Sequence, residues 1–146
     1  MTLLISHRGN TSGVKKDLEN NPKYIEQAIE KGYEVEVDIW LKDNKFFLGH
    51  DLPEYEINKT WILNKREKLW FHCKNLEILN HFTESKKNFK FFWHQKDDFT
   101  LTSNGYIWTY PGKKITKNSI IVSLGRENID NDVYGICSDF VDYLKF

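Results

Sequence analysis

The chain has 146 residues, a length typical of one domain, and we expect residues 1–146 to form a single domain. A formal net charge of zero excludes a general electrostatic attraction to nucleic acid or to an anionic membrane. With two cysteines, no secretory signal and no apolar run of about 18 residues, the composition predicts a cytoplasmic protein without a disulfide framework. It leaves a monomer and a homo-oligomer both open.

Short apolar runs follow one another along the chain, and most of them end in polar residues, a pattern that predicts buried strands. Residues 22–32 predict a helix that begins at Pro22 and ends at Gly32, and a second helix is expected from Leu76 onward. Residues 51–66 are expected to form a loop. The predicted strands, in chain order, are Leu3–Ser6, Glu34–Leu41, Lys45–Gly49, Leu69–Lys74, Phe89–Trp93, Tyr106–Thr109, Ser119–Leu124 and Tyr134–Cys137.

The spacing of these runs determines the expected fold class. Helices between the early strands favour parallel βα units, whereas the later connections, about ten residues long, are too short for crossover helices. A complete eight-stranded barrel usually needs about 200 residues or more. We therefore expect an α/β fold, namely a reduced TIM-type (β/α) barrel with shortened later helices. An open α/β sheet is the alternative.

Polar side chains stand at or near the ends of several of these strands. Each has an ordinary structural interpretation, such as a solvated strand face, a hairpin end or a buried hydrogen-bonded histidine. Because the carboxyl ends of parallel barrel strands meet at one mouth, their coincidence favours a functional site. The residues concerned are His7, Arg8, Glu36, Asp38, His50, His72 and Lys74.

Together, these residue types can bind a metal ion and a phosphate group and can transfer protons. Glu36 and Asp38 lie two apart, and therefore on one face of a strand, where paired carboxylates suit a hard divalent cation such as Mg²⁺ or Ca²⁺. A cation together with Arg8 would neutralise phosphate oxygens. Two histidines can share proton transfer near neutral pH.

The same residues resemble the glycerophosphodiester phosphodiesterase and phosphatidylinositol-phospholipase-C-like superfamily. The sequence departs from the family pattern at two places, since no proline precedes Glu19-Asn20 and His72 replaces an acidic ligand. The stretch from Phe92 to Gly112 is similar to a short branch of that superfamily. The matching motifs are Ile5-Ser6-His7-Arg8-Gly9, Glu19-Asn20, Glu36-Val37-Asp38, Leu48-Gly49-His50-Asp51, Phe71-His72-Cys73-Lys74 and Gly135-Ile136-Cys137-Ser138-Asp139.

This resemblance implies a barrel that hydrolyses a phosphodiester with the help of one divalent cation. It implies that His7 and His50 are the catalytic acid–base pair and that Arg8 and Lys74 bind the phosphate. Glu36 and Asp38 would hold the metal, with His72 as a third ligand. Because imidazole favours softer metals, Mn²⁺ and Zn²⁺ join Mg²⁺ and Ca²⁺ as candidates.

Four further residues are candidates for lining the site, namely Asn20, His94, Trp108 and Asp139. For His94 and Trp108, packing in the core is the competing interpretation. The leading functional hypothesis is hydrolysis of a small phosphodiester, such as a glycerophosphodiester or a sugar-phosphate diester. The alternatives are a catalytically inactive module that binds a phosphate ligand and a metal-dependent nuclease, against which the neutral charge argues.

Overall fold

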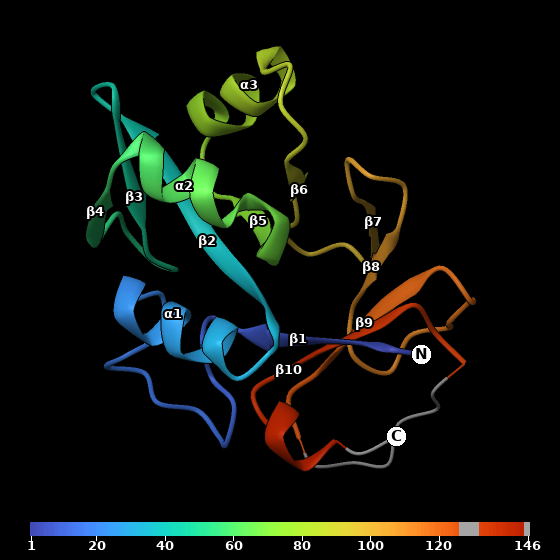
Figure 1. The fold of residues 1–146 in the computed structure, drawn as a ribbon. Coiled ribbons are helices and arrows are strands. Elements are labelled where there is room, and N and C mark those ends of the chain that lie inside the picture. Colours follow the sequence, from blue (N-terminus) through green and yellow to red (C-terminus); the bar gives the residue numbers. More distant parts are fainter. Residues whose placement is uncertain (126–131, 145–146) are drawn as a thin grey trace.

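The computed structural model describes residues 1–125 and 132–144, which fold around one curled, mixed β-sheet (Figure 1). The helices in these ranges are α1 (Pro22–Glu30), α2 (Lys59–Lys65) and α3 (Leu76–Glu84), with short 3₁₀ helices η1 (Arg66–Lys68) and η2 (Val141–Tyr143). The strands are β1 (Leu3–His7), β2 (Glu34–Lys42), β3 (Lys45–Leu48), β4 (Tyr55–Ile57), β5 (Leu69–Cys73), β6 (Lys90–Phe92), β7 (Phe99–Leu101), β8 (Ile107–Thr109), β9 (Ser119–Ser123) and β10 (Gly135–Ser138). No helix within the described ranges is both long and apolar enough to cross a membrane.

The long strand β2 joins the parts of the sheet. Its first residues pair with β1 in parallel, its end pairs with β3 in an antiparallel hairpin, and β5 runs parallel to it along the other edge. Parallel ladders extend the sheet from β1 through β10 and β9 to β8, and from β5 to β6. The carboxyl ends of β1, β2, β5 and β10 therefore lie at the same edge.

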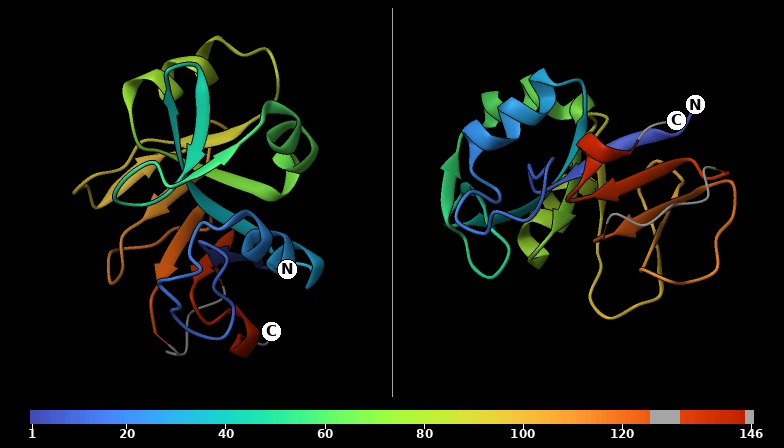
Figure 2. Two further views of the ribbon diagram at one scale, coloured as in Figure 1. Left: turned by 90° about the vertical axis from the view of Figure 1, so that its left-hand side faces the viewer. Right: turned by 90° about the horizontal axis from the view of Figure 1, so that it is seen from below.

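The predicted TIM-type barrel is wrong. The chain contains no regular alternation of strand and helix, because the three α-helices all precede β6 and the connections from β6 to β10 carry none among the described residues. No ladder joins β6 to β8 in the part of the chain that the structure describes, so the sheet remains a curled half-barrel. Both views in Figure 2 show the α-helices gathered beside the first half of the sheet. The short later connections explain the difference, since they cannot supply helices to cover and close it.

Each α-helix begins after an asparagine whose side chain caps it. Asn21 accepts a hydrogen bond from the backbone of Lys23, Asn58 caps α2, and Asn75 caps α3. The helix α2 and the strand β4 lie within residues 51–66, where a loop was predicted. The prediction there is wrong, because elements of seven and three residues are too short to show a clear hydrophobic period.

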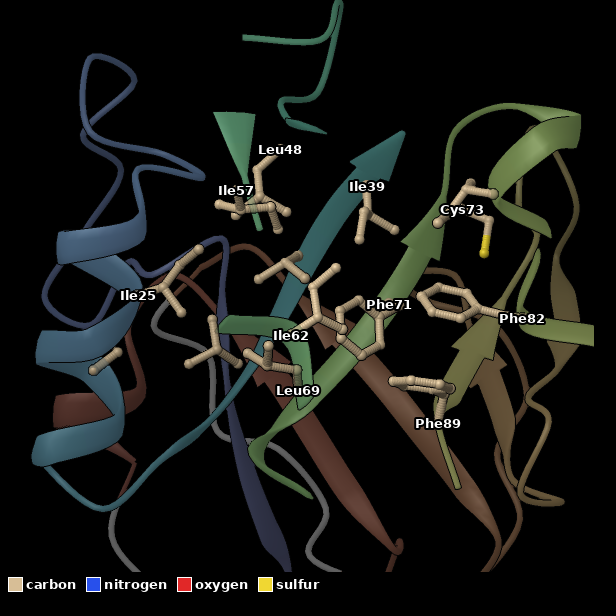
Figure 3. Close-up of a cluster of buried hydrophobic side chains, with 14 residues drawn as sticks. Ile25, Ile39, Leu48, Ile57, Ile62, Leu69, Phe71, Cys73, Phe82 and Phe89 are labelled. Atoms are coloured by element: carbon tan, nitrogen blue, oxygen red, sulfur yellow. The ribbon is translucent and has the colours of Figure 1, made fainter. Parts of the chain in front are cut away.

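Two hydrophobic clusters occupy the two faces of the sheet. On the helix side, the core in Figure 3 packs Ile25, Ile62 and Phe82 against outward residues of β2 and β5, including Ile39 and Phe71. The inner face carries a second cluster of Ile5, Trp70, Phe92, Trp108, Ile120 and Cys137. Because side chains alternate along a strand, the apolar residues of β2 that face the helices leave Glu36 and Asp38 on the inner face.

Phe71 tests the helix-side core. Its side chain is fully buried and its ring lies 5.0 Å from that of Phe82, so Phe71→Ala should lower the free energy of unfolding by about 3–5 kcal/mol. Leu101→Ala is the matched control, since this side chain is 70 % exposed and its loss should change stability by less than about 0.5 kcal/mol. Urea denaturation measures both. Similar small losses in the two variants would contradict this packing.

Candidate functional site

The end of β1 forms a tight turn that presents two predicted site residues, His7 and Arg8. The backbone N–H of Asn10 donates to the carbonyl of His7 at 2.9 Å, and φ is +58° at Arg8 and +96° at Gly9. Positive φ at both central positions is typical of a type I′ turn. A side chain at Gly9 would bring its Cβ within 2.5 Å of the Tyr24 ring, so glycine is required there. Arg8 carries a side chain and lacks the conformational freedom of glycine. Its left-handed backbone is therefore strained, and strain of this kind clusters at functional sites.

His7 is oriented by Asp139, which follows β10. Nδ1 of His7 lies 2.8 Å from Oδ1 of Asp139, and Nε2 lies 3.7 Å from Oε2 of Glu36. Burial lowers the pKa of His7, but the hydrogen bond to Asp139 and the charge of Glu36 outweigh it, so this pKa is raised. In the neutral ring we assign the proton to Nδ1, which donates it in the hydrogen bond to Asp139. Nε2 then carries no proton and faces Glu36 and the pocket.

Asn10 holds this pair in place, a role that was not predicted from the sequence. Its side chain is fully buried, and its amide donates to Oδ1 of Asp139 at 2.8 Å and to Oε2 of Glu19 at 2.7 Å. Its carbonyl accepts from the Tyr24 hydroxyl at 3.0 Å. The available signal was a polar residue at the last position of the turn. Because Asn10 is fully hydrogen-bonded, Asp139 has little freedom to rotate away from His7.

Glu36, Asp38 and His72 form the centre of the site. Each residue contributes one ligand atom to a group lying within 4.8 Å, and the two carboxylate residues are 2 % and 0 % exposed. Oε2 of Glu36 and Oδ1 of Asp38 are buried without a hydrogen-bond partner. Nδ1 of His72 approaches Oδ1 of Asp38 to 3.0 Å, but no hydrogen bond of good geometry joins them. Buried carboxylate oxygens without a hydrogen-bond partner are unfavourable unless a nearby positive charge or a bound proton neutralises them.

The orientation of His72 suits a metal ligand. Nε2 lies 3.0 Å from the backbone carbonyl of His94, to which it donates, so that in the neutral ring Nδ1 carries the lone pair. Nδ1 is the atom nearest the carboxylates, 3.8 Å from Oε1 of Glu36. Histidines that bind metals in proteins usually have their other ring nitrogen fixed in this way.

Asp38 is supported from two further sides. Asn20 donates from its amide to Oδ2 of Asp38 at 2.9 Å and accepts from the Asp38 backbone at 3.0 Å, while Nε of Arg8 lies 3.2 Å from the same Oδ2. Burial works against the ionised carboxyl, but the contacts with His72 and Arg8 lower the pKa of Asp38. The pKa of Glu36 is instead raised by burial and by the neighbouring charge of Asp38. Asp38 is therefore firmly ionised, whereas Glu36 takes up a proton more readily.

One pocket of about 340 Å³ collects most of the predicted site residues. His7, Arg8, Glu36, His50, His72, Lys74, His94 and Trp108 all line it. The remaining three are found behind or beside it: Asp38 is buried below, Asp139 stands behind His7, and Asn20 lines a neighbouring hollow with Arg8 and His50. Trp108 is only 4 % exposed and stacks on Phe92, so it belongs largely to the core.

His50 is the most exposed of the pocket histidines. Its side chain is 42 % exposed, and Nδ1 lies 2.7 Å from Oδ1 of the exposed Asp51. The preceding Gly49 has a φ of +153°, and a Cβ there would stand 2.1 Å from the Leu52 carbonyl. The indole of Trp40 donates to the Gly49 carbonyl at 2.7 Å. These constraints fix where the loop leaves β3 and so keep His50 at the rim.

Comparison with protein-family models, curated proteins and solved structures finds no match. The resemblance to the phosphodiesterase superfamily therefore rests on the motifs alone and stays a prediction. The barrel that it implies does not form among the described residues.

The geometry predicts that Asp38→Asn weakens binding of a divalent cation by at least about tenfold, because a buried anionic ligand is lost. Isothermal calorimetry with Mg²⁺, Ca²⁺, Mn²⁺ and Zn²⁺ measures the affinities. Glu56→Gln, an equivalent change at an exposed carboxylate on β4, should leave them unchanged. Equal binding by the two variants would place the metal elsewhere.

Proton competition gives a second test of the same cluster. The pKa of Glu36 is raised, and that of His72 is also raised, since its contacts with Asp38 outweigh burial. A metal must displace these protons, so affinity should be highest at alkaline pH and fall as the pH decreases, beginning above about pH 6.5. Calorimetry across this range measures the trend. Affinity that does not change between pH 8 and pH 5 would contradict it.

Proposed function

We propose that this protein hydrolyses a small phosphodiester with the help of one divalent cation. The observation that carries the proposal is the pair of unsatisfied buried oxygens on Glu36, which lines the pocket with His7 and Arg8, and on the buried Asp38 beside it. The oxygens of Glu36 and Asp38 with Nδ1 of His72 would hold the cation. Carboxylate ligands suit Mg²⁺ or Ca²⁺, and the imidazole ligand makes Mn²⁺ and Zn²⁺ competent as well.

The pocket supplies groups for each part of the reaction. When bound, the cation would neutralise phosphate oxygens as charge develops on them. Arg8 and Lys74 bring further positive charge to the same pocket, where they would bind the non-reacting phosphate oxygens. The resemblance of the strand-end motifs to those of phosphodiesterases supports this assignment.

His7 and His50 would transfer the protons. Nε2 of His7 takes a proton from the attacking water as the water oxygen bonds to phosphorus, and Asp139 stabilises the resulting imidazolium through Nδ1. As the bond from phosphorus to the leaving oxygen breaks, that oxygen takes a proton from His50. Buried between the pocket and Asp139, His7 is the better preorganised of the two.

The second candidate function is a module that binds a phosphate ligand without turnover. The observation that favours it is the exposure of His50, which lies on a loop and whose carboxylate partner Asp51 is 87 % exposed. A proton donor held so loosely contributes less to a transition state than a buried one. In both functions, the phosphate would be bound by the cation, Arg8 and Lys74.

Measurements of kcat distinguish the phosphodiesterase from the binding module. With metal present, His7→Ala and His50→Ala should each lower kcat by about 10²-fold or more on phosphodiesters, and the double variant should be little worse. A panel of glycerophosphodiesters, sugar-phosphate diesters and aryl phosphodiesters measures this, with chelator abolishing turnover. His81→Ala is the matched control, because this histidine lies on α3 beside Phe46 and Phe82. Intact phosphate binding without metal-dependent turnover across the panel would favour the binding module.

A further inference from the structure

The walls of the pocket differ in polarity from one strand end to the next. The ends of β1, β2 and β5 contribute charged or polar residues, whereas the ends of β8 and β9 contribute Tyr110, Pro111, Val122 and Leu124. Tyr110 is 51 % exposed and Leu124 is 52 % exposed, although both line the same pocket as His7 and His72. Large apolar side chains left open to solvent beside a polar site indicate contact with a ligand.

This apolar wall continues beyond the pocket. A neighbouring hollow of about 510 Å³ shares Tyr110, Pro111, Val122 and Leu124 with it, and adds the apolar Ile115 and Ile121 together with Gly112, Lys113, Ser123 and Gly125. The shared residues make the two hollows one continuous surface. A ligand group that entered over β8 and β9 could therefore extend several atoms away from the cluster of Glu36, Asp38 and His72.

Backbone hydrogen bonds hold the parts of the wall around Tyr110 and Val122. The Lys113 N–H donates to the Tyr110 carbonyl at 3.2 Å across Pro111 and Gly112, and the φ of Gly112 is +77°. Proline followed by a residue of positive φ is the signature of a type II turn. On the other side, Val122 lies in the ladder that joins β9 to β10. A preformed surface of this kind binds without first having to be ordered.

We propose that this wall binds an apolar ester substituent of the phosphodiester, an alkyl or aryl group, and that it selects such substrates over esters of polyols. The inference rests on the proposed function and specifies its substrate class. The sheet curls so that the Tyr110 ring stands 6.4 Å from the ring of His94, whose backbone carbonyl accepts from His72, and the wall therefore borders the pocket beside the metal cluster. A polyol there would lose hydration from its hydroxyls while facing carbon atoms, whereas an alkyl or aryl group gains from burial.

Binding of phosphate monoesters tests the proposal without requiring turnover. In the presence of Mn²⁺, calorimetry would compare methyl, butyl, hexyl and phenyl phosphate with glycerol phosphate and inorganic phosphate. Each buried methylene should tighten binding by up to about fourfold, so hexyl and phenyl phosphate should bind at least about tenfold more tightly than glycerol phosphate. The proposal is overturned if affinity does not rise along the alkyl series, or if glycerol phosphate binds as tightly as hexyl phosphate.

Single substitutions test whether the residues of the wall cause the dependence of affinity on chain length. Leu124→Ser and Tyr110→Ser should flatten the dependence on chain length and leave the affinity for inorganic phosphate within about twofold. Leu101→Ser on β7, also a highly exposed leucine, should leave the whole series unchanged. Leu124→Ile keeps the apolar surface and should keep the chain-length dependence. Weakening of every ligand by the same factor in both Leu124 variants would contradict a wall specific for the substituent.

The same titrations distinguish this inference from the proposed function. If inorganic phosphate binds with metal but the series is flat, the apolar wall is wrong and the phosphate site stands. If inorganic phosphate itself does not bind, the phosphate site is wrong, and the substrate class fails with it.

Discussion

Two carboxylates buried side by side on β2 impose the constraint that the rest of the site must meet. Glu36 and Asp38 point to the inner face because the alternate residues of β2 supply the core beneath the helices. Burying a carboxylate away from water is unfavourable unless cations and hydrogen bonds replace the lost hydration. Arg8, Asn20 and His72 each come from a different segment, and each contacts Asp38. Glu36 receives less support, and burial together with the neighbouring charge of Asp38 raises its pKa.

This requirement accounts for several local features that stability alone does not explain. The left-handed backbone at Arg8 and Asn20 directs both side chains toward Asp38, and the carbonyl of Asn20 accepts from the Asp38 backbone. Strain of this kind persists where surrounding contacts over-determine the conformation. The contact between Asn10 and Asp139 extends the same network to His7. Metal binding and proton transfer, as proposed, would therefore depend on one hydrogen-bonded unit.

The sequence predicted the parts of the site that repeat with a strand's period. The alternation in β2 placed Glu36 and Asp38 on one face, and the polar strand ends identified His7 and His72. Asn10 escaped notice because a single buried asparagine leaves no periodic signal. Its role depends on Asp139, 129 residues away along the chain. At the end of β8, Trp108 was predicted as a candidate for lining the site with core packing as the alternative, and the exposed apolar residues around it were not predicted, since exposure cannot be read from residue type.

The fold was predicted only in part. Most strands were located, but the reduced barrel was inferred from the spacing of strands and helices, and it required the late strands to close the sheet. The ladder from β10 to β1 does form, whereas β6 pairs only with β5 among the described residues. Short elements such as β4, α2 and β7 carry too few residues for periodicity to define them. Their positions follow from long-range pairing, which one sequence does not reveal.

The central claim is that a divalent cation occupies the space between Glu36, Asp38 and His72. Anomalous X-ray diffraction from crystals soaked in Mn²⁺ measures this directly, because the ion's scattering marks its position without reference to activity. The account predicts one strong peak bounded by Oε2 of Glu36, Oδ1 of Asp38 and Nδ1 of His72. A peak at another group of residues, or none at this cluster at a saturating Mn²⁺ concentration, would contradict it.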